Sequence, residues 1–231
     1  MEHETIGVIS DIHANIVALD AVLEDMPPVE TIVCCGDIIG ILGSNHECVQ
    51  LVQDECSDVV LGNHDARVRP DFAYNPSFPS ARDEMGLVAE QLTERDVDWI
   101  AGLPDRVETD QFVLAHARPF YYRDPGYPCH GFAEGDYGIR PRDFTRVGPN
   151  LDGKVALLGH THEQHALDCS KFEGQSGLVV NPGSVGVPWD GMAEYATVNL
   201  DTHEYDLCSV EYDTQLVRER IEEVGLDVDA Y

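Results

Sequence analysis

Residues 58–65, Asp58-Val59-Val60-Leu61-Gly62-Asn63-His64-Asp65, are the stretch that decides the fold. Val59 to Leu61 are apolar and are expected to form a short buried strand, and Gly62 permits a sharp turn at its end. An amide, an imidazole and a carboxylate follow, and each offers a different kind of coordination or proton chemistry. The rest of the chain repeats this design: an apolar run, an abrupt stop, then polar residues of the metal-ligand type.

Strands and helices alternate in the first half of the chain, and strands dominate the second half. Hydrophobic spacing predicts helices over residues 14–25, 45–55, 79–100 and 214–224. Apolar runs predict strands over residues 5–10, 31–35, 59–61, 106–109, 112–115, 155–158, 166–169, 178–180, 195–200 and 204–210. There is no internal repeat or interdomain linker, so residues 1–231 are expected to form a single domain.

Six apolar runs end at residues with Asp, Asn or His side chains: Asp11, Asp37, Asn63, His116, His160 and Asn181. In α/β sheets, ligands bind beyond the carboxyl ends of the strands. One shared site, built from residues distant in the sequence, is therefore the simplest explanation of all six ends.

The formal net charge of −29 is unusual for a chain of 231 residues. Lysine is nearly absent, with only Lys154 and Lys171 present. Such a charge repels itself at ordinary ionic strength, whereas concentrated salt screens it. We therefore infer a halophilic source, against the plainer alternative of an ordinary acidic protein. The acidic surface also argues against a nucleic-acid polymer as partner, because that binding depends on Lys and Arg at the phosphates.

The N-terminal sequence and the cysteines indicate a protein that is not exported. The acidic segment 1–4 leads directly into a predicted strand, without the features of a signal peptide, and no apolar run approaches the ~20 residues that span a bilayer. Seven cysteines, an odd number with no C-x-x-C pair, suggest reduced thiols rather than disulfides or a structural zinc site. We expect a cytoplasmic location and no membrane contact.

Several of the strand-end residues are candidate metal ligands, although each has a plainer alternative. Asp11 and His13 are two residues apart, so on extended chain their side chains point the same way. A carboxylate with an imidazole suits manganese, iron or zinc. Asp37 adds a carboxylate whose two oxygens could bridge two ions, but a helix N-cap would explain it too.

The histidines and Asn63 carry similar alternatives. His160 and His162 repeat the i, i+2 spacing, but they could be solvent-facing residues in a turn. His116 alone could be a satisfied buried histidine, and Asn63 a turn residue with positive φ. The conjunction favours metal ligands, because each of five motifs follows an apolar run: D-x-H, G-D, G-N-H-D, H and G-H-T-H.

In this order the motifs resemble the signature of the calcineurin-like metallophosphoesterase superfamily. The resemblance covers the chain from Ile6 to about Tyr212. Residues 10–13 (SDIH), 36–40 (GDIIG) and 181–186 (NPGSVG) are similar to its small, single-domain bacterial and archaeal phosphodiesterases. With the charge, this suggests a halophilic archaeon. The resemblance implies a four-layer αββα sandwich of two mixed β-sheets flanked by helices, with a dinuclear metal site at the sheet rim.

The resemblance also implies a role for each site residue. Three residues would hold one divalent ion: Asp11, His13 and His162. Three others would hold a second: Asn63, His116 and His160. Asp37 would bridge the two ions, which we expect to be manganese, with iron, zinc or nickel as alternatives. His64 would be the general acid, and Asp65 would either orient His64 or cap the turn.

Such a site is suited to phosphate-ester hydrolysis. Two ions ~3.5–4 Å apart clamp phosphate oxygens and provide hydroxide at neutral pH, and protonation of the leaving alkoxide by His64 adds ~10²–10⁴-fold. We expect a phosphodiesterase acting on a small nucleotidic or other phosphodiester. A phosphomonoesterase, a dinucleoside polyphosphate hydrolase and a non-catalytic scaffold of the same fold are alternatives. Scaffolds lose ligands or the catalytic histidine, and this chain keeps them all.

Some residues depart from the pattern of relatives. Ala14 and Ala117 stand where Gly is usual, which narrows the backbone conformations beside the site. Gly40 occupies the place of the metal-bound Tyr of purple acid phosphatases, which argues against a coloured iron centre. The G-D-x-x-D-R-G and G-N-H-E motifs of Ser/Thr protein phosphatases are missing.

Residues 117–150 are the main clue to the substrate. They hold five of the twelve arginines and four tyrosines, and their net charge is +1. Arginine grips phosphate bidentately and tyrosine stacks on bases, so we hypothesise an inserted flap that binds substrate through Arg118 and Arg123. Alternatively, these arginines pair with acids of the same segment to hold a long loop down. Further candidate substrate contacts are Arg67, Arg69 and Asn181.

Overall fold

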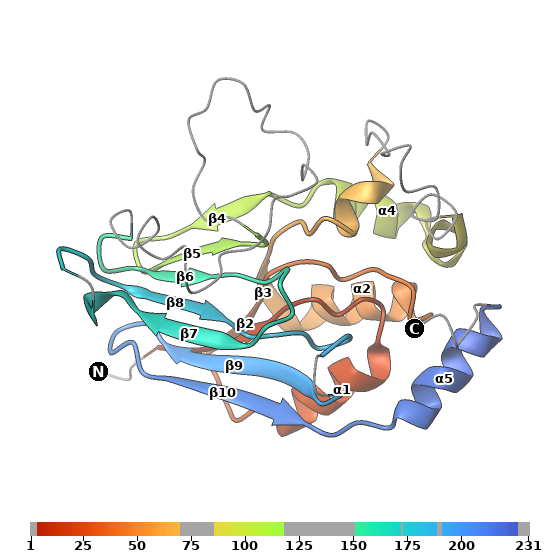
Figure 1. The fold of residues 1–231 in the computed structure, drawn as a ribbon. Helices are drawn as coiled ribbons and strands as arrows, with labels where there is room; N and C mark the ends of the chain where they lie inside the picture. Colours follow the sequence, from red (N-terminus) through yellow and green to blue (C-terminus); the bar gives the residue numbers. More distant parts are fainter. Residues whose placement is uncertain (1–3, 70–85, 118–150, 172, 189–190, 226–231) are drawn as a thin grey trace.

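Two mixed five-stranded β-sheets face each other across a common core (Figure 1). The computed structural model describes residues 4–69, 86–117, 151–171, 173–188 and 191–225. The strand order is β10-β9-β1-β2-β3 in the first sheet and β4-β5-β6-β8-β7 in the second. In each sheet three neighbouring strands are parallel, β1–β2–β3 and β5–β6–β8. In the first sheet β9 pairs antiparallel with β1 and β10 with β9, both on one side, whereas in the second sheet β4 and β7 pair antiparallel at the two edges. The prediction of two mixed sheets flanked by helices is confirmed.

The described elements have the following bounds. The first sheet consists of β1 (Thr5–Ile9), β2 (Thr31–Cys34), β3 (Cys56–Val59), β9 (Ala193–Asn199) and β10 (Tyr205–Val210). The second consists of β4 (Arg106–Glu108), β5 (Phe112–Ala115), β6 (Val155–Leu157), β7 (His165–Asp168) and β8 (Leu178–Asn181). The helices are α1 (Ile16–Asp25), α2 (Asn45–Glu55), α4 (Glu94–Ala101), α5 (Thr214–Glu223) and the 3₁₀ turns η1 (Asp65–Val68) and η4 (Cys169–Lys171). Residues 86–91 are also helical.

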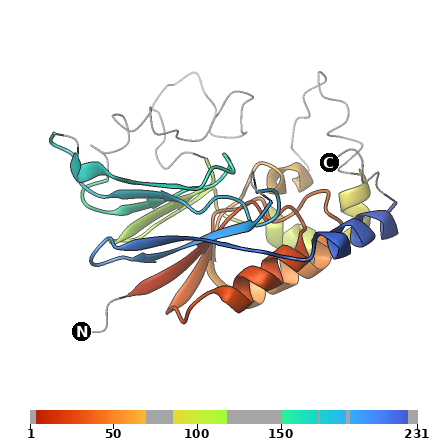
Figure 2. The same cartoon turned by 60° about the horizontal axis from the view of Figure 1, so that its bottom comes forward.

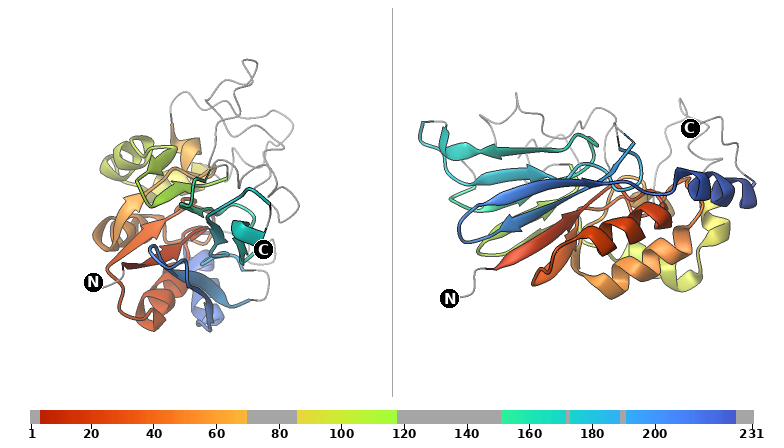
Figure 3. Two further views of the ribbon diagram at one scale, coloured as in Figure 1. Left: turned by 90° about the vertical axis from the view of Figure 1, so that its left-hand side faces the viewer. Right: turned by 90° about the horizontal axis from the view of Figure 1, so that it is seen from below.

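Alternating apolar side chains place one core between the sheets and another beneath the helices. Ile6 and Val8 of β1 point into the inter-sheet core, where they join Leu157 and Val180 of the second sheet. Ile9 belongs to the second core, on the face covered by α1 and α2 (Figures 2 and 3). The burial of both faces explains why the central strands read as continuous apolar runs. Within the described ranges, none of the helices is both long and apolar enough to cross a membrane.

Three of the differences between predicted and observed boundaries have a clear physical reason. The predicted helix over residues 79–100 is interrupted: residues 86–91 are helical, and α4 begins anew at Glu94, because Thr93 and Asp96 form a capping box. Residues 79–85 lie outside the described residues. The α1 helix begins at Ile16 rather than at residue 14, because Ala14 has a φ of 63° and Asn15 caps the helix. The third strand ends at Val59, because Leu61 N donates to Pro104 O (2.8 Å) and the chain leaves β2 there.

The carboxyl ends of the two sets of parallel strands meet at one rim. Residues that follow β1 and β2 bond to each other, with Asp11 N donating to Gly36 O (3.0 Å). The residue after β5 reaches the end of β2, since His116 Nδ1 lies 2.8 Å from Cys35 O. The turn after β6 closes the ring, because His160 N donates to the Asp11 carboxylate (2.9 Å). The ends of β1, β2, β5 and β6 therefore converge, as a single shared site requires.

Candidate metal centre

The turns that carry the candidate ligands have an unusual backbone. Five of the predicted ligands lie in the left-handed region: Asp11 (φ 54°), His13 (50°), Asp37 (54°), His160 (71°) and His162 (54°). Each such residue costs about 1–2 kcal/mol, and strain of this kind concentrates at functional sites. Asn63 does not have a positive φ, so the alternative of a left-handed turn residue does not apply to it.

Glycines at the strand ends allow these turns to touch. A Cβ on Gly62 would lie 2.1 Å from Asp37 N, and one on Gly159 would lie 1.9 Å from Ser10 Oγ. Backbone bonds then lock neighbouring turns, as His13 N donates to Asp37 O (3.0 Å) and Ala14 N to Ile38 O (2.9 Å). The glycines of the G-D, G-N-H-D and G-H-T-H motifs are therefore required for steric reasons, because only residues without a Cβ let these four strand ends approach within contact distance.

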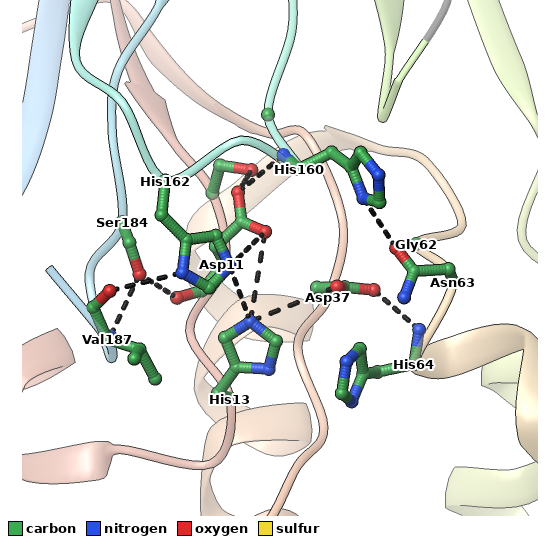
Figure 4. Close-up of polar contacts among 12 residues, drawn as sticks. Asp11, His13, Asp37, Gly62, Asn63, His64, His160, His162, Ser184 and Val187 are labelled. Carbon is green, nitrogen blue, oxygen red and sulfur yellow. Dashed lines mark hydrogen bonds and ion pairs between the residues drawn. The ribbon is translucent and has the colours of Figure 1, made fainter. Parts of the chain in front are cut away.

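One group of donor atoms comes from Asp11, His13 and His162 (Figure 4). The Asp11 Oδ1 atom lies 3.2 Å from His162 Nε2, and His162 Nε2 lies 3.1 Å from His13 Nε2. The other oxygen, Asp11 Oδ2, accepts from Ser10 Oγ (2.6 Å) and from His160 N (2.9 Å). Only Oδ1 therefore points into the group.

A second group forms around Asn63. Asn63 Oδ1 lies 2.7 Å from His160 Nδ1 and 3.0 Å from His116 Nε2. His116 Nε2 in turn lies 3.3 Å from Asp37 Oδ2. Since ions with bonds of about 2.0–2.2 Å place adjacent donors roughly 3 Å apart, these spacings fit coordination of one divalent ion.

Asp37 lies between the two groups. Its Oδ1 accepts from His64 N (2.7 Å). Its Oδ2 lies 3.3 Å from His116 Nε2 of the second group and 3.9 Å from His13 Nε2 of the first. The expectation that two separate oxygens face two ions is therefore corrected, because only Oδ2 faces both groups.

A buried carboxylate oxygen and an imidazole nitrogen face each other in the first group. Asp11 is fully buried, and its Oδ1 lies 3.2 Å from Nε2 of the half-buried His162. His162 Nδ1 lies 3.1 Å from Val187 O, so in a neutral ring Nδ1 carries the proton and Nε2 has a lone pair. Burial opposes a charge on His162, but the contact with Asp11 raises the pKa of this histidine. A positive charge between the two atoms, either a proton or a bound cation, is therefore favoured.

The charge states of the predicted ligands differ from one residue to another. Burial disfavours a charged His116, but the carboxylates of Asp37 and Asp11 outweigh it and raise the pKa of His116 to about 10. Burial likewise opposes ionisation of Asp37, yet His116 holds the pKa of this carboxyl well below its usual range. Burial lowers the pKa of His13 and of His160, so both are neutral at pH 7, as metal ligands must be.

Comparison with known proteins identifies the family. The sequence profile of the calcineurin-like phosphoesterase superfamily domain matches residues 5–203. The chain belongs to this superfamily. It is 27% identical to an uncharacterized protein of Methanocaldococcus jannaschii, over 96% of this chain and 93% of that protein.

Solved structures agree with the calcineurin-like phosphoesterase fold. A metallophosphoesterase from Sphaerobacter thermophilus superposes with a TM-score of 0.77 at 27% identity, covering 99% of this chain and 96% of that one. A hypothetical protein from Pyrococcus horikoshii gives a TM-score of 0.72 at 18% identity, covering 97% and 95% of the two chains, and so supports the fold alone.

His64, the predicted general acid of this phosphoesterase, lies beside the first group. Its ring packs edge-on to the ring of His13, with centroids 4.6 Å apart (Figure 4). Burial lowers the pKa of His64 to about 3, with Asp37 acting in the opposite direction. His64, His13 and Asp37 also have candidate ligand atoms within 4.8 Å of one another, so His64 is near enough to ligate as well.

Two residues predicted to contact substrate, Asn181 and Arg69, are hydrogen-bonded to loops of the protein. Asn181 is buried; its amide donates to Gly159 O (2.9 Å) and Thr161 Oγ1 (3.0 Å), which anchors the turn that carries His160 and His162. Arg69 donates to Leu103 O (2.9 Å) and to Ala101 O (3.3 Å), so its guanidinium holds a loop. We therefore no longer regard either residue as a substrate contact.

Two other predictions concern arginines. Arg67, in η1, is half-buried and close enough to His64 that its charge contributes to the lowered pKa of that histidine, after burial. The predicted flap lies outside the described residues except for Ala117, and so do Arg118 and Arg123.

The sequence reasoning missed the groups that orient the ligands. The Cys35 and Val187 carbonyls fix the tautomers of His116 and His162. Ser184 Oγ donates to Asp11 O (2.8 Å) and accepts from Val187 N (2.8 Å), which links the turn after β1 to the loop after β8. A backbone carbonyl has no residue-type signature, so only the N-P-G-S-V-G motif could have pointed to this loop.

Proposed function

We propose that this member of the superfamily is a metal-dependent phosphodiesterase acting on a small phosphodiester. Two groups of side chains would each hold one divalent ion: Asp11, His13 and His162, and Asn63, His116 and His160. Asp37 Oδ2 would contribute to both. The observation that carries the proposal is the geometry of the first group, in which the buried Asp11 Oδ1 lies 3.2 Å from His162 Nε2 and His162 Nε2 lies 3.1 Å from His13 Nε2.

The chain's own residues have distinct tasks in this proposal. When bound, two divalent ions supply Lewis-acid polarisation of phosphoryl oxygens and water of lowered pKa. The His64 N–H holds Asp37 Oδ1, which orients Oδ2 toward both groups. The charge of Arg67 reaches His64, where it would also attract a phosphate group.

His64 would protonate the leaving oxygen. In the free protein, burial keeps this histidine neutral at pH 7, since its pKa is about 3. The negative charge of a bound phosphate ester favours the charged imidazolium, so the proton is taken up with the substrate. Its transfer to an alkoxide leaving group accounts for ~10²–10⁴-fold in rate. The manganese preference, the cytoplasmic location and the halophilic source stay predictions from the sequence.

The test is hydrolysis of two diesters by the full chain with Mn²⁺ in concentrated salt. Bis(p-nitrophenyl) phosphate has a leaving group that departs without a proton, whereas a dinucleoside monophosphate releases an alkoxide. We expect Asp37→Ala to abolish both activities. His64→Ala should lose ~10²–10⁴-fold on the dinucleoside but much less on the nitrophenyl ester.

A matched control is His203→Asn. His203 lies in the turn between β9 and β10, beside the amino end of β1 and away from the strand ends that carry the site. This variant should keep both activities. Full activity of Asp37→Ala and His64→Ala on the dinucleoside substrate would show that the site is wrongly assigned. If the native chain binds Mn²⁺ but cleaves only monoesters, the phosphodiesterase assignment is wrong, and a chain that neither binds Mn²⁺ nor cleaves any ester is a scaffold.

A further inference from the structure

Asp65 is a fully buried carboxylate beside the site that the proposed ion-binding groups do not use. Its two oxygens serve two different loops. Oδ1 accepts from Ile38 N (2.9 Å) and Ile39 N (3.1 Å), in the loop after β2. Oδ2 accepts from Gly62 N (3.0 Å), in the loop after β3. One side chain therefore joins two strand ends.

The two joined loops carry the central residues of the site. Asp37 directly precedes Ile38, and His64 follows Gly62 by two residues. A second carboxylate crosses in the opposite sense, since Asp37 Oδ1 accepts from His64 N (2.7 Å). Each loop thus donates backbone N–H groups to a carboxylate of the other. A reciprocal clamp of this kind fixes the distance between Asp37 and His64.

A plain turn-capping role does not explain these bonds. A cap satisfies N–H groups of its own turn, and Asp65 does so only through Gly62. The bonds to Ile38 and Ile39 span 27 and 26 residues of sequence, and they join strand ends in place of capping. Direct orientation of the His64 ring does not explain them either, because both Asp65 oxygens are used by backbone N–H groups.

We infer that Asp65 is a positioning residue: it acts through the backbone to hold Asp37 Oδ2 toward the ions and His64 toward the leaving group. The inference rests on the proposed function. Partners that orient ligands from behind commonly change metal affinity or activity by about 10–100-fold when removed. Because the Asp65 contacts reach both loops, its loss should affect ion binding and proton transfer together.

The test is Asp65→Asn, which keeps the volume of the side chain. An amide oxygen can accept from one loop, but the NH₂ group cannot accept from the other, so one anchor is lost. We expect the Kd for Mn²⁺, measured by calorimetric titration, to rise about 10–100-fold. At saturating Mn²⁺, kcat for the dinucleoside substrate should still fall by about tenfold or more, with KM changed less.

Asn199→Ala is the matched control. Asn199 Oδ1 also accepts from two backbone N–H groups, of Asp201 (3.1 Å) and Thr202 (2.8 Å), in the turn between β9 and β10. It should lower the melting temperature without changing the Mn²⁺ Kd or kcat. The inference is overturned if Asp65→Asn stays within about twofold of the native protein in both quantities, or if Asn199→Ala shows the same losses.

A measurement on the native chain covers the case in which Asp65→Asn does not fold. The amide hydrogens of Ile38, Ile39 and Gly62 should exchange slowly and at similar rates, as one cooperative unit. Fast exchange of any of the three would overturn the clamp. Failure of the proposed function gives a different result, because the native chain itself would then neither bind Mn²⁺ nor hydrolyse a diester.

Discussion

A single added methyl group at Gly62 should disable the site. A Cβ there would lie 2.1 Å from Asp37 N and 2.1 Å from Asp37 Oδ1, whereas real Cβ contacts are essentially never under 3.0 Å. Asp37 or residue 62 therefore has to move by roughly 1 Å. Overpacking of this kind costs about 1–3 kcal/mol of unfolding free energy, and a 1 Å misplacement in an active site costs about 10²-fold in rate.

The experiment compares Gly62→Ala with Gly86→Ala. An added Cβ at Gly86 meets nothing within 4 Å in the described part of the chain, and residue 86 is helical, so this control should be neutral or slightly stabilising. Urea unfolding, Mn²⁺ titration and diester hydrolysis are measured for both. We expect Gly62→Ala alone to lose about 1–3 kcal/mol and about 10²-fold in activity. Equal Mn²⁺ affinity and hydrolysis in the two variants would refute the reasoning.

Four further predictions follow from charge and strain. Because the carboxylates raise the pKa of His116 to about 10, an entering ion must displace a proton, so Mn²⁺ affinity should rise about tenfold per pH unit between roughly pH 7 and 9; a flat profile in calorimetric titrations would contradict this. In the metal-free protein the positive charge on His116 stabilises the fold below pH 6.5, and this stabilisation is lost as the pH rises toward 10. The unfolding free energy of the metal-free protein should therefore fall between pH 6.5 and 10. Ala14 has a φ of 63°, and relief of this strain exceeds the loss of its buried methyl group, so Ala14→Gly should raise the unfolding free energy by about 0.5–1 kcal/mol in urea titrations. A lower unfolding free energy would contradict this. The net charge of −29 predicts that the melting temperature rises from dilute to molar KCl, and a constant melting temperature would count against a halophilic source.

The positions of the site residues could be predicted because strand ends are visible in the sequence. Asp11, Asp37 and His160 each follow an apolar run, and the carboxyl ends of parallel strands share one rim. The prediction of one continuous helix over residues 79–100 missed an interruption at residues 92–93, because the hydrophobic periodicity runs on across it. The Thr93-x-x-Asp96 capping box was the available signal, and it marks the true start of α4.

The contacts that orient the ligand side chains could not be predicted from the sequence. The direction of Asp37 depends on the His64 N–H, and the tautomer of His162 depends on the Val187 carbonyl. Both partners are backbone groups, which every residue has. Asn181 and Arg69 show the converse, because polar side chains near a site are as often used to hold loops as to hold ligands.

The left-handed backbone at five predicted ligands limits how the protein can evolve. Only glycine, asparagine and aspartate adopt that conformation readily, so most single replacements at Asp11, His13 or His162 would retain the strain while losing the donor atom. A lineage that abandoned catalysis should therefore accumulate Gly or Asn at these positions before other residues. Such replacements in homologous sequences would show that catalysis was lost while the fold was kept.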